Sequence, residues 1–131
     1  MSRPKQIIVM RKFPSMRTGK YCAQAAHASM KAFLDSGAVT VGEDGRFSVD
    51  ISNPDAVAWI GGIFTKIATY VESEAELLAL AEQAKAAGLP VGLVQDNGLT
   101  EFKGVPTYTA LGIGPASAEA LAPITGKLPL F

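Results

Sequence analysis

The sequence contains few of the residues that build metal centres and disulfide frameworks. Its 131 residues include one cysteine, Cys22, and one histidine, His27. A single cysteine excludes a disulfide framework and a multi-cysteine zinc site, and a single histidine excludes a histidine cluster around a metal ion. The composition therefore predicts no metal site. It also indicates a protein of a reducing compartment, for which we expect the cytoplasm.

Long apolar runs are absent as well. The longest run, residues 56–64, contains two glycines and is much shorter than the ~20 residues that cross a bilayer. The apolar run near the N-terminus ends at Arg11 and Lys12, which makes it too short for a secretory signal. Because 48% of the residues are hydrophobic and 18% are charged, we expect one folded domain, residues 1–131, without a membrane span.

The charges balance overall but are unevenly distributed. The chain has twelve basic and twelve acidic residues, so its net charge is zero. Residues 1–34 contain seven basic and no acidic residues, whereas residues 35–131 contain five basic and twelve acidic ones. A local positive field can attract a polyanion even when the whole molecule is neutral. The skew is compatible with a nucleic-acid partner, and equally with ordinary solvated lysines.

The hydrophobic pattern predicts strands alternating with helices. Short runs of β-branched and apolar residues indicate strands at 6–10, 64–71, 90–94 and 107–113. Capping residues and helical spacing indicate helices at 18–34, 53–61, 73–88 and 116–121. Residues 38–52 are expected to form a loop or a small hairpin, and the apolar tail 128–131 to pack on the body. This order predicts an α/β fold with a mixed sheet and helices on both faces.

The helix predicted at 18–34 has an apolar stripe. At about 100° per residue, four apolar side chains fall on one side of it. We expect this stripe to face the core, with the cysteine buried, and Thr18 to cap the start of the helix. The stripe consists of Cys22, Ala26, Met30 and Phe33.

The opposite side of the same helix carries a polar stripe that is a candidate ligand site. Gly19 would let a ligand approach the backbone, and free N–H groups at a helix start favour an anion. Lys20 would add a positive charge there. The alternative is the ordinary polar face of a surface helix. The stripe consists of Lys20, Gln24, His27 and Lys31.

A second candidate site follows the third predicted strand. Asp96 begins the segment Asp96-Asn97-Gly98-Leu99-Thr100, and Thr107 and Thr109 follow on the next strand. α/β proteins place ligand sites at the carboxyl ends of strands, where this carboxylate stands. The alternative is a plain turn, for which Asn-Gly is a common dipeptide.

Four segments together resemble the second-type peptidyl-tRNA hydrolase family. The first is residues 19–28, with their Gly-Lys, Gln and Ala-His spacing. The others are residues 96–100, residues 111–115 and residues 124–128. The likeness extends over residues 6–131, except for 37–58. Two residues depart from the family pattern: Asn97 replaces the usual alanine, and Leu99 replaces a residue that is often basic.

The resemblance implies a three-layer α/β/α domain with a four-stranded mixed sheet. It also implies hydrolysis of the ester between a peptide and the 3′ ribose of tRNA, a homodimer, and no metal or organic cofactor. The catalytic positions it implies are Lys20, Asp96, Thr100 and Thr109, with Thr107 as the alternative to Thr109. We expect further substrate contacts from Arg17, Gly19, Gln24, His27 and Gly98.

Two other functions remain open at the level of sequence. The same residue types would serve a non-catalytic adaptor that binds RNA or protein. They would also serve a deacylase that acts on another aminoacyl-tRNA ester.

Overall fold

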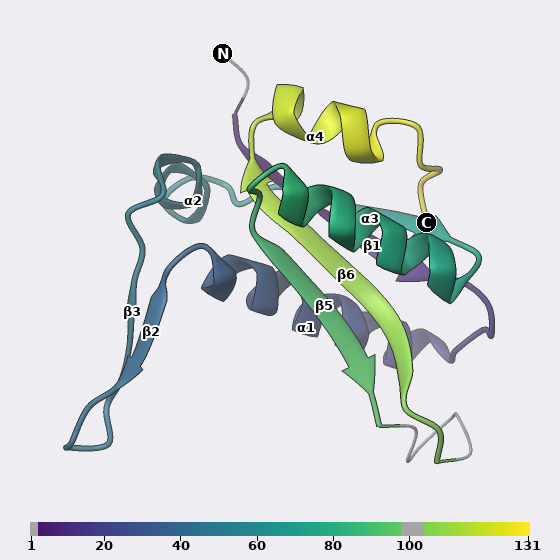
Figure 1. Ribbon diagram of the computed structural model, residues 1–131, viewed down its shortest axis with the longest axis horizontal. Helices are drawn as coiled ribbons and strands as arrows, with labels where there is room; N and C mark the ends of the chain where they lie inside the picture. The colour runs from purple at the N-terminus through teal and green to yellow at the C-terminus, as the bar shows by residue number, and fades with distance from the viewer. Residues whose placement is uncertain (1–2, 98–103) are drawn as a thin grey trace.

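The computed structural model describes residues 3–97 and 104–131, and its centre is a four-stranded mixed sheet (Figure 1). The strands lie in the order β4 (Lys66–Val71), β1 (Lys5–Arg11), β6 (Thr107–Ala116) and β5 (Val91–Asp96). Strand β1 runs parallel to β4, whereas β6 runs antiparallel to both β1 and β5. The four predicted strands and the mixed character of the sheet are thereby confirmed.

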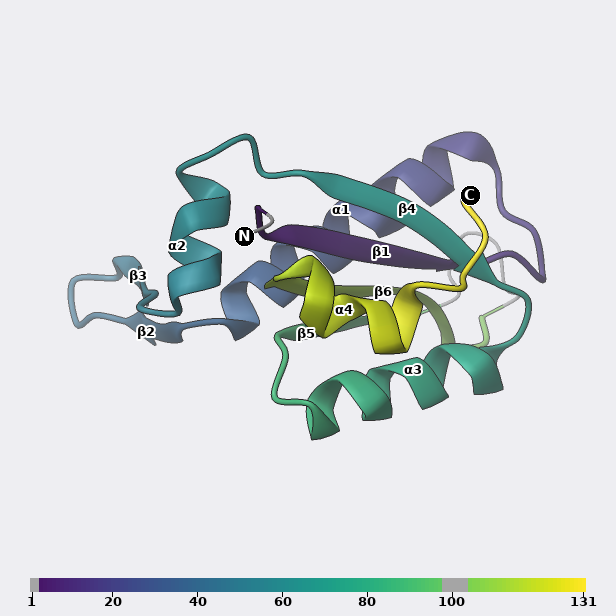
Figure 2. The same cartoon turned by 90° about the horizontal axis from the view of Figure 1, so that it is seen from above.

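Helices cover both faces of this sheet (Figure 2). Helix α1 (Thr18–Asp35) packs on one face against β5, β6 and β1, and α2 (Pro54–Ile60) lies near the end of β6. Helices α3 (Glu74–Ala86) and α4 (Ala118–Thr125) pack on the other face. The structure is a three-layer α/β/α fold, as the resemblance implies.

Most of the core lies between the sheet and the pair α3 and α4. Leu77, Leu111 and Ile113 are fully buried there. The layer under α1 is thinner and is built around Ile8, Met10 and small residues of the helix and sheet. The thin layer brings the backbone of α1 close to the strands.

Polar caps begin two of the helices as the sequence predicts. The Asn53 side chain accepts hydrogen bonds from the N–H groups of Asp55 and Ala56, and Ser73 accepts one from Glu76. The prediction for α1 was wrong, because Arg17 occupies the capping position in an extended conformation and makes no side-chain capping bond. Thr18 is the first residue of the helix itself.

The apolar stripe of α1 does not face the core, which corrects that prediction. Cys22, Ala26 and Met30 are exposed, and Phe33 is half-buried. The buried side consists of small and polar residues, namely Gln24, Ala28, Ser29 and Ala32.

Glycines in the sheet explain this orientation of α1. A Cβ atom at Gly112 would lie 2.4 Å from the carbonyl oxygen of Ala28, and one at Gly92 would lie 2.4 Å from the amide nitrogen of Ala32. The helix backbone therefore rests directly on the strands, where large side chains have no room. A prediction from hydrophobic spacing assigns the large apolar residues to the buried side of the helix. For α1 it therefore chose the side that the structure leaves exposed.

Residues 38–50 form a hairpin, which confirms one of the two predicted alternatives. Its strands are β2 (Ala38–Val41) and β3 (Phe47–Asp50), and they form a separate two-stranded sheet. The predicted packing of the tail is also confirmed, since Leu130 forms a bridge with Thr69 and the Phe131 ring contacts Tyr21. Across residues 3–97 and 104–131, every helix is too short or too polar to span a bilayer.

Candidate functional site

Lys20 and Asp96 meet at one end of the sheet. The Lys20 ammonium lies 2.7 Å from a carboxylate oxygen of Asp96, and the two side chains are 17% and 10% exposed. Lys20 stands in the first turn of α1, whereas Asp96 is the last residue of β5. The pair is shielded enough to strengthen its attraction, yet both groups retain contact with solvent.

Packing along the middle of α1 and at its C-terminal end positions Lys20 beside Asp96. Near the middle of the helix, Gly92 and Gly112 allow the close approach to β5 and β6. At its C-terminal end, a carboxylate oxygen of Asp35 accepts a hydrogen bond from the Val91 amide at 2.8 Å. Helix α1 therefore runs along β5 over its whole length, and its first turn reaches the last residue of that strand.

A β-bulge directs Thr109 toward α1. Val94 pairs with Ala110 and Gln95 pairs with Tyr108, so Thr109 is the extra residue on β6. A bulge re-aims side chains, and here the Thr109 hydroxyl donates a hydrogen bond to the side-chain oxygen of Gln24 at 2.6 Å. Thr109 is 1% exposed and Gln24 is 4% exposed, so this link lies beneath the surface of the site.

Thr107, the alternative to Thr109, lies beside Asp96 in the sheet. It pairs directly with Asp96 across the ladder between β5 and β6. Its hydroxyl donates a hydrogen bond to the carbonyl oxygen of Val105 at 2.9 Å. Thr107 is therefore the nearer of the two to Asp96 in strand register, whereas Thr109 connects β6 to α1.

The other candidates on α1 line its exposed side and its first turn. Arg17, Gly19 and His27 are exposed, and a Cβ atom at Gly19 would meet open space. Lys31 donates a hydrogen bond to the carbonyl oxygen of Leu93 at 2.8 Å. The predicted polar stripe thus follows β5, with Lys20 and Gln24 joined to the strands and His27 directed to solvent. Gly98 and Thr100 lie outside the described residues.

Tyr21 is a residue of this region that sequence reasoning missed. Its hydroxyl accepts a hydrogen bond from the Met16 amide and donates one to the carbonyl oxygen of Lys12. Tyr21 thereby fixes the loop that leads into α1 next to Lys20. The signal available in the sequence was a hydroxyl-bearing ring within an alanine-rich helix.

Basic side chains near this end have separate structural contacts. Arg11 forms an ion pair with Glu74 at 2.9 Å and binds the carbonyl oxygen of Phe13 at 2.6 Å. The Lys12 ammonium lies 4.2 Å from the centre of the Tyr70 ring. Among the residues that the structure describes, no three histidine, cysteine, aspartate or glutamate side chains gather as a metal site.

Known proteins share similarity with this chain over nearly its whole length. The sequence model of a family described as "Peptidyl-tRNA hydrolase PTH2" matches residues 4–131. The chain belongs to this family. A peptidyl-tRNA hydrolase from Methanopyrus kandleri is 40% identical over 127 residues, which cover 97% of each chain. A peptidyl-tRNA hydrolase from Methanocaldococcus jannaschii is 35% identical over 128 residues, covering 97% of this chain and 99% of its own.

Membership of the peptidyl-tRNA hydrolase PTH2 family confirms the resemblance noted from four short segments. The match also includes residues 37–58, which those segments left out. The hairpin is therefore part of the matched chain and lies between α1 and α2.

Proposed function

We propose that this member of the family hydrolyses the ester that joins a peptide to the 3′ ribose of tRNA. The observation that carries the proposal is the 2.7 Å contact between Lys20 and Asp96, at the point where α1 begins and β5 ends. Family membership supports an enzyme over an adaptor. It likewise supports peptidyl-tRNA over another aminoacyl-tRNA ester as the substrate.

Hydrolysis of this ester needs an activated water and a group that stabilises the oxyanion. In the proposed reaction, the Asp96 carboxylate accepts a proton from water, directly or through Thr100. The hydroxide adds to the carbonyl carbon, the bond to the 3′ oxygen of the ribose breaks, and that oxygen takes up the proton. Lys20 and the N–H groups near Gly19 stabilise negative charge, on the oxyanion or on a tRNA phosphate.

The remaining site residues have supporting roles in this proposal. Thr109 acts through Gln24, because both side chains are buried and their hydrogen bond is 2.6 Å long. Gln24 in turn lies one helical turn beyond Lys20 and steadies that side of α1. Arg17, Gly19 and His27 contact the tRNA or the peptide from their exposed positions. Gly98, which lies outside the described residues, is a further proposed substrate contact on the basis of the family resemblance.

Several broader properties belong to the proposal. The positive charge of residues 1–34 favours the tRNA backbone as a partner. The protein is expected to act in the cytoplasm as a homodimer, each copy one domain of residues 1–131. The reaction needs no metal or organic cofactor, so hydrolysis should persist in the presence of a chelator.

One assay separates the proposed function from its alternatives. N-acetylated aminoacyl-tRNA and free aminoacyl-tRNA are compared as substrates at equal concentration. Turnover of the acylated form alone is the expected result. Turnover of free aminoacyl-tRNA would favour a deacylase that acts on another aminoacyl-tRNA ester. Binding of tRNA without turnover would favour a non-catalytic adaptor.

A further inference from the structure

The β2–β3 hairpin has one apolar face. In an antiparallel pair, residues directly opposite each other point to the same side. Val39 pairs with Val49 and Val41 with Phe47, so these four side chains share one face. The other face carries Ala38, Thr40, Ser48 and Asp50.

This apolar face is uncovered in the described chain. Val39, Val41 and Phe47 are 44%, 69% and 59% exposed. Figures 1 and 2 show the hairpin extending from the end of α1, away from the four-stranded sheet. An isolated two-stranded hairpin is only marginally stable in water, and an alternating strand pattern normally buries its apolar side. The hairpin therefore requires a surface against which to pack.

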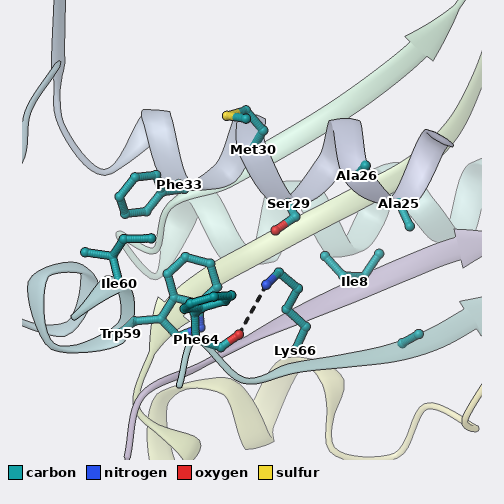
Figure 3. A pocket seen from close by; sticks show the side chains of 11 residues that line it. Ile8, Ala25, Ala26, Ser29, Met30, Phe33, Trp59, Ile60, Phe64 and Lys66 are labelled. Atoms are coloured by element: carbon teal, nitrogen blue, oxygen red, sulfur yellow. Dashed lines mark hydrogen bonds between the residues drawn. The ribbon is translucent and has the colours of Figure 1, made fainter. Parts of the chain in front are cut away.

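The same chain presents an open apolar groove. A cavity of about 560 Å³ lies between α1, α2 and the edge strand β4 (Figure 3). Its walls include Met30, Phe33, Trp59, Ile60 and Phe64. Part of this wall is the apolar stripe of α1 that faces away from the core. Met30 and Ile60 are 63% and 49% exposed, so the groove is a second surface that lacks cover in the described chain.

The charges of the hairpin and the groove are complementary. Lys66 is the charged residue that lines the groove, where its ammonium lies 4.9 Å from the Trp59 ring centre and 4.5 Å from that of Phe64. The turn of the hairpin carries the acidic residues Glu43 and Asp44, and Arg46 lies 3.2 Å from the Asp44 carboxylate, whereas Asp50 stands on the polar face. An acidic, apolar arm disfavours tRNA as its partner and suits a groove with one cation.

We propose that the hairpin of one copy packs its apolar face into the groove of a second copy of this chain. The proposal rests on the homodimer of the proposed function and assigns its contact surface. Because each copy has one arm and one groove, a two-fold arrangement uses both arms and both grooves and closes the assembly. The groove lies beside α2, which directly follows the arm in the chain.

The first test measures the dimer by sedimentation equilibrium. Val41→Asp and Met30→Asp should each weaken the dimer Kd at least about tenfold, because each places a charge in an apolar contact. Thr40→Asp is the matched control, since it adds the same charge to the polar face of the same hairpin. The thermal midpoint of each variant shows that it remains folded. A wild-type monomer at all concentrations, or equal weakening by Thr40→Asp, would overturn the proposal.

The second test asks whether the contact lies between copies. In a Cys22→Ser background, Val41→Cys protein is mixed with Ile60→Cys protein and oxidised. A disulfide between the two variants is expected, whereas Glu82→Cys on α3, on the far face of the sheet, should not join to Val41→Cys. Absence of the first disulfide, or equal formation of the second, would contradict the assigned surface.

The outcomes also separate this proposal from the proposed function. Hydrolysis by Val41→Asp reports on the catalytic site, which lies at the other end of α1. A dimer that resists both arm and groove variants would reject the exchange and leave the homodimer intact. A loss of tRNA binding in Val41→Asp without a change in dimer Kd would show an RNA contact instead and overturn the proposal.

Discussion

The Lys20 ammonium contacts the Asp96 carboxylate at 2.7 Å, although 76 positions separate the two residues in the sequence. Both side chains are largely buried and lie where α1 and β5 meet. A cation and a carboxylate that are partly shielded from solvent can respectively stabilise an oxyanion and accept a proton. This contact is the structural basis of the proposed ester hydrolysis.

Removal of the Lys20 charge should slow turnover strongly. We expect Lys20→Met to lower kcat about 10²-fold or more, because a charged donor near the oxyanion is lost. Single-turnover hydrolysis of N-acetylated aminoacyl-tRNA measures this effect. Lys31→Met is the matched control on the same helix and should keep most of the activity. An equal loss of kcat in both variants would show that any positive charge on this helix has the same effect. That result would contradict a specific role for Lys20.

The Thr109 hydroxyl should matter through Gln24. Thr109→Val leaves the buried oxygen of Gln24 without its donor, which should cost about 1–3 kcal/mol of unfolding free energy. We also expect a lower kcat with little change in KM, and recovery of both properties in Thr109→Ser. Urea denaturation and steady-state kinetics measure the two effects. A larger loss of kcat in Thr107→Val than in Thr109→Val would identify Thr107 as the family threonine instead.

Arg17 should contribute to binding of the tRNA backbone. Arg17→Ala is expected to weaken tRNA binding and to reduce the slope of log K against log salt by about 0.7–0.9 for one lost phosphate contact. Filter binding at several salt concentrations gives the slope. Lys85→Ala, an exposed change on α3, should leave it as it is in the wild type. An unchanged slope in Arg17→Ala removes this residue from the interface.

The glycines beneath α1 should be essential for stability. Gly112→Ala would place a Cβ atom 2.4 Å from the Ala28 carbonyl oxygen, so the helix must move. We expect a loss of roughly 1–3 kcal/mol in unfolding free energy, and lower activity because α1 carries Lys20. Gly19→Ala is the control for stability, since its Cβ would meet nothing within 4 Å. Similar stability of the two variants would contradict the close packing of α1.

Local patterns in the sequence were sufficient to predict most of the elements. Asn53 and Ser73 cap their helices through their own side chains, so the residue type at one position marks the start. Strands β1 and β4 consist largely of β-branched and apolar residues, and such short runs correctly predicted both strands. The expectation that Lys20 and Asp96 lie close together in space is confirmed by their 2.7 Å contact.

Long-range packing could not be predicted in the same way. The orientation of α1 depends on Gly92 and Gly112, which lie more than 50 positions away in the sequence and have no side chains to reveal the contact. Consequently Cys22 was expected in the core and is exposed. The bulge at Thr109 depends on pairing between β5 and β6, and strand pairing is likewise not encoded in either segment alone.

The most direct test of the account is the turnover of Asp96→Asn with N-acetylated aminoacyl-tRNA. Asparagine preserves the size of the side chain and an oxygen that can bind Lys20, while it removes the proton acceptor. With a normal thermal midpoint and unchanged tRNA binding, kcat should fall by about 10²-fold or more. Near-normal kcat in this variant would contradict the central claim that the carboxylate at the end of β5 activates the water.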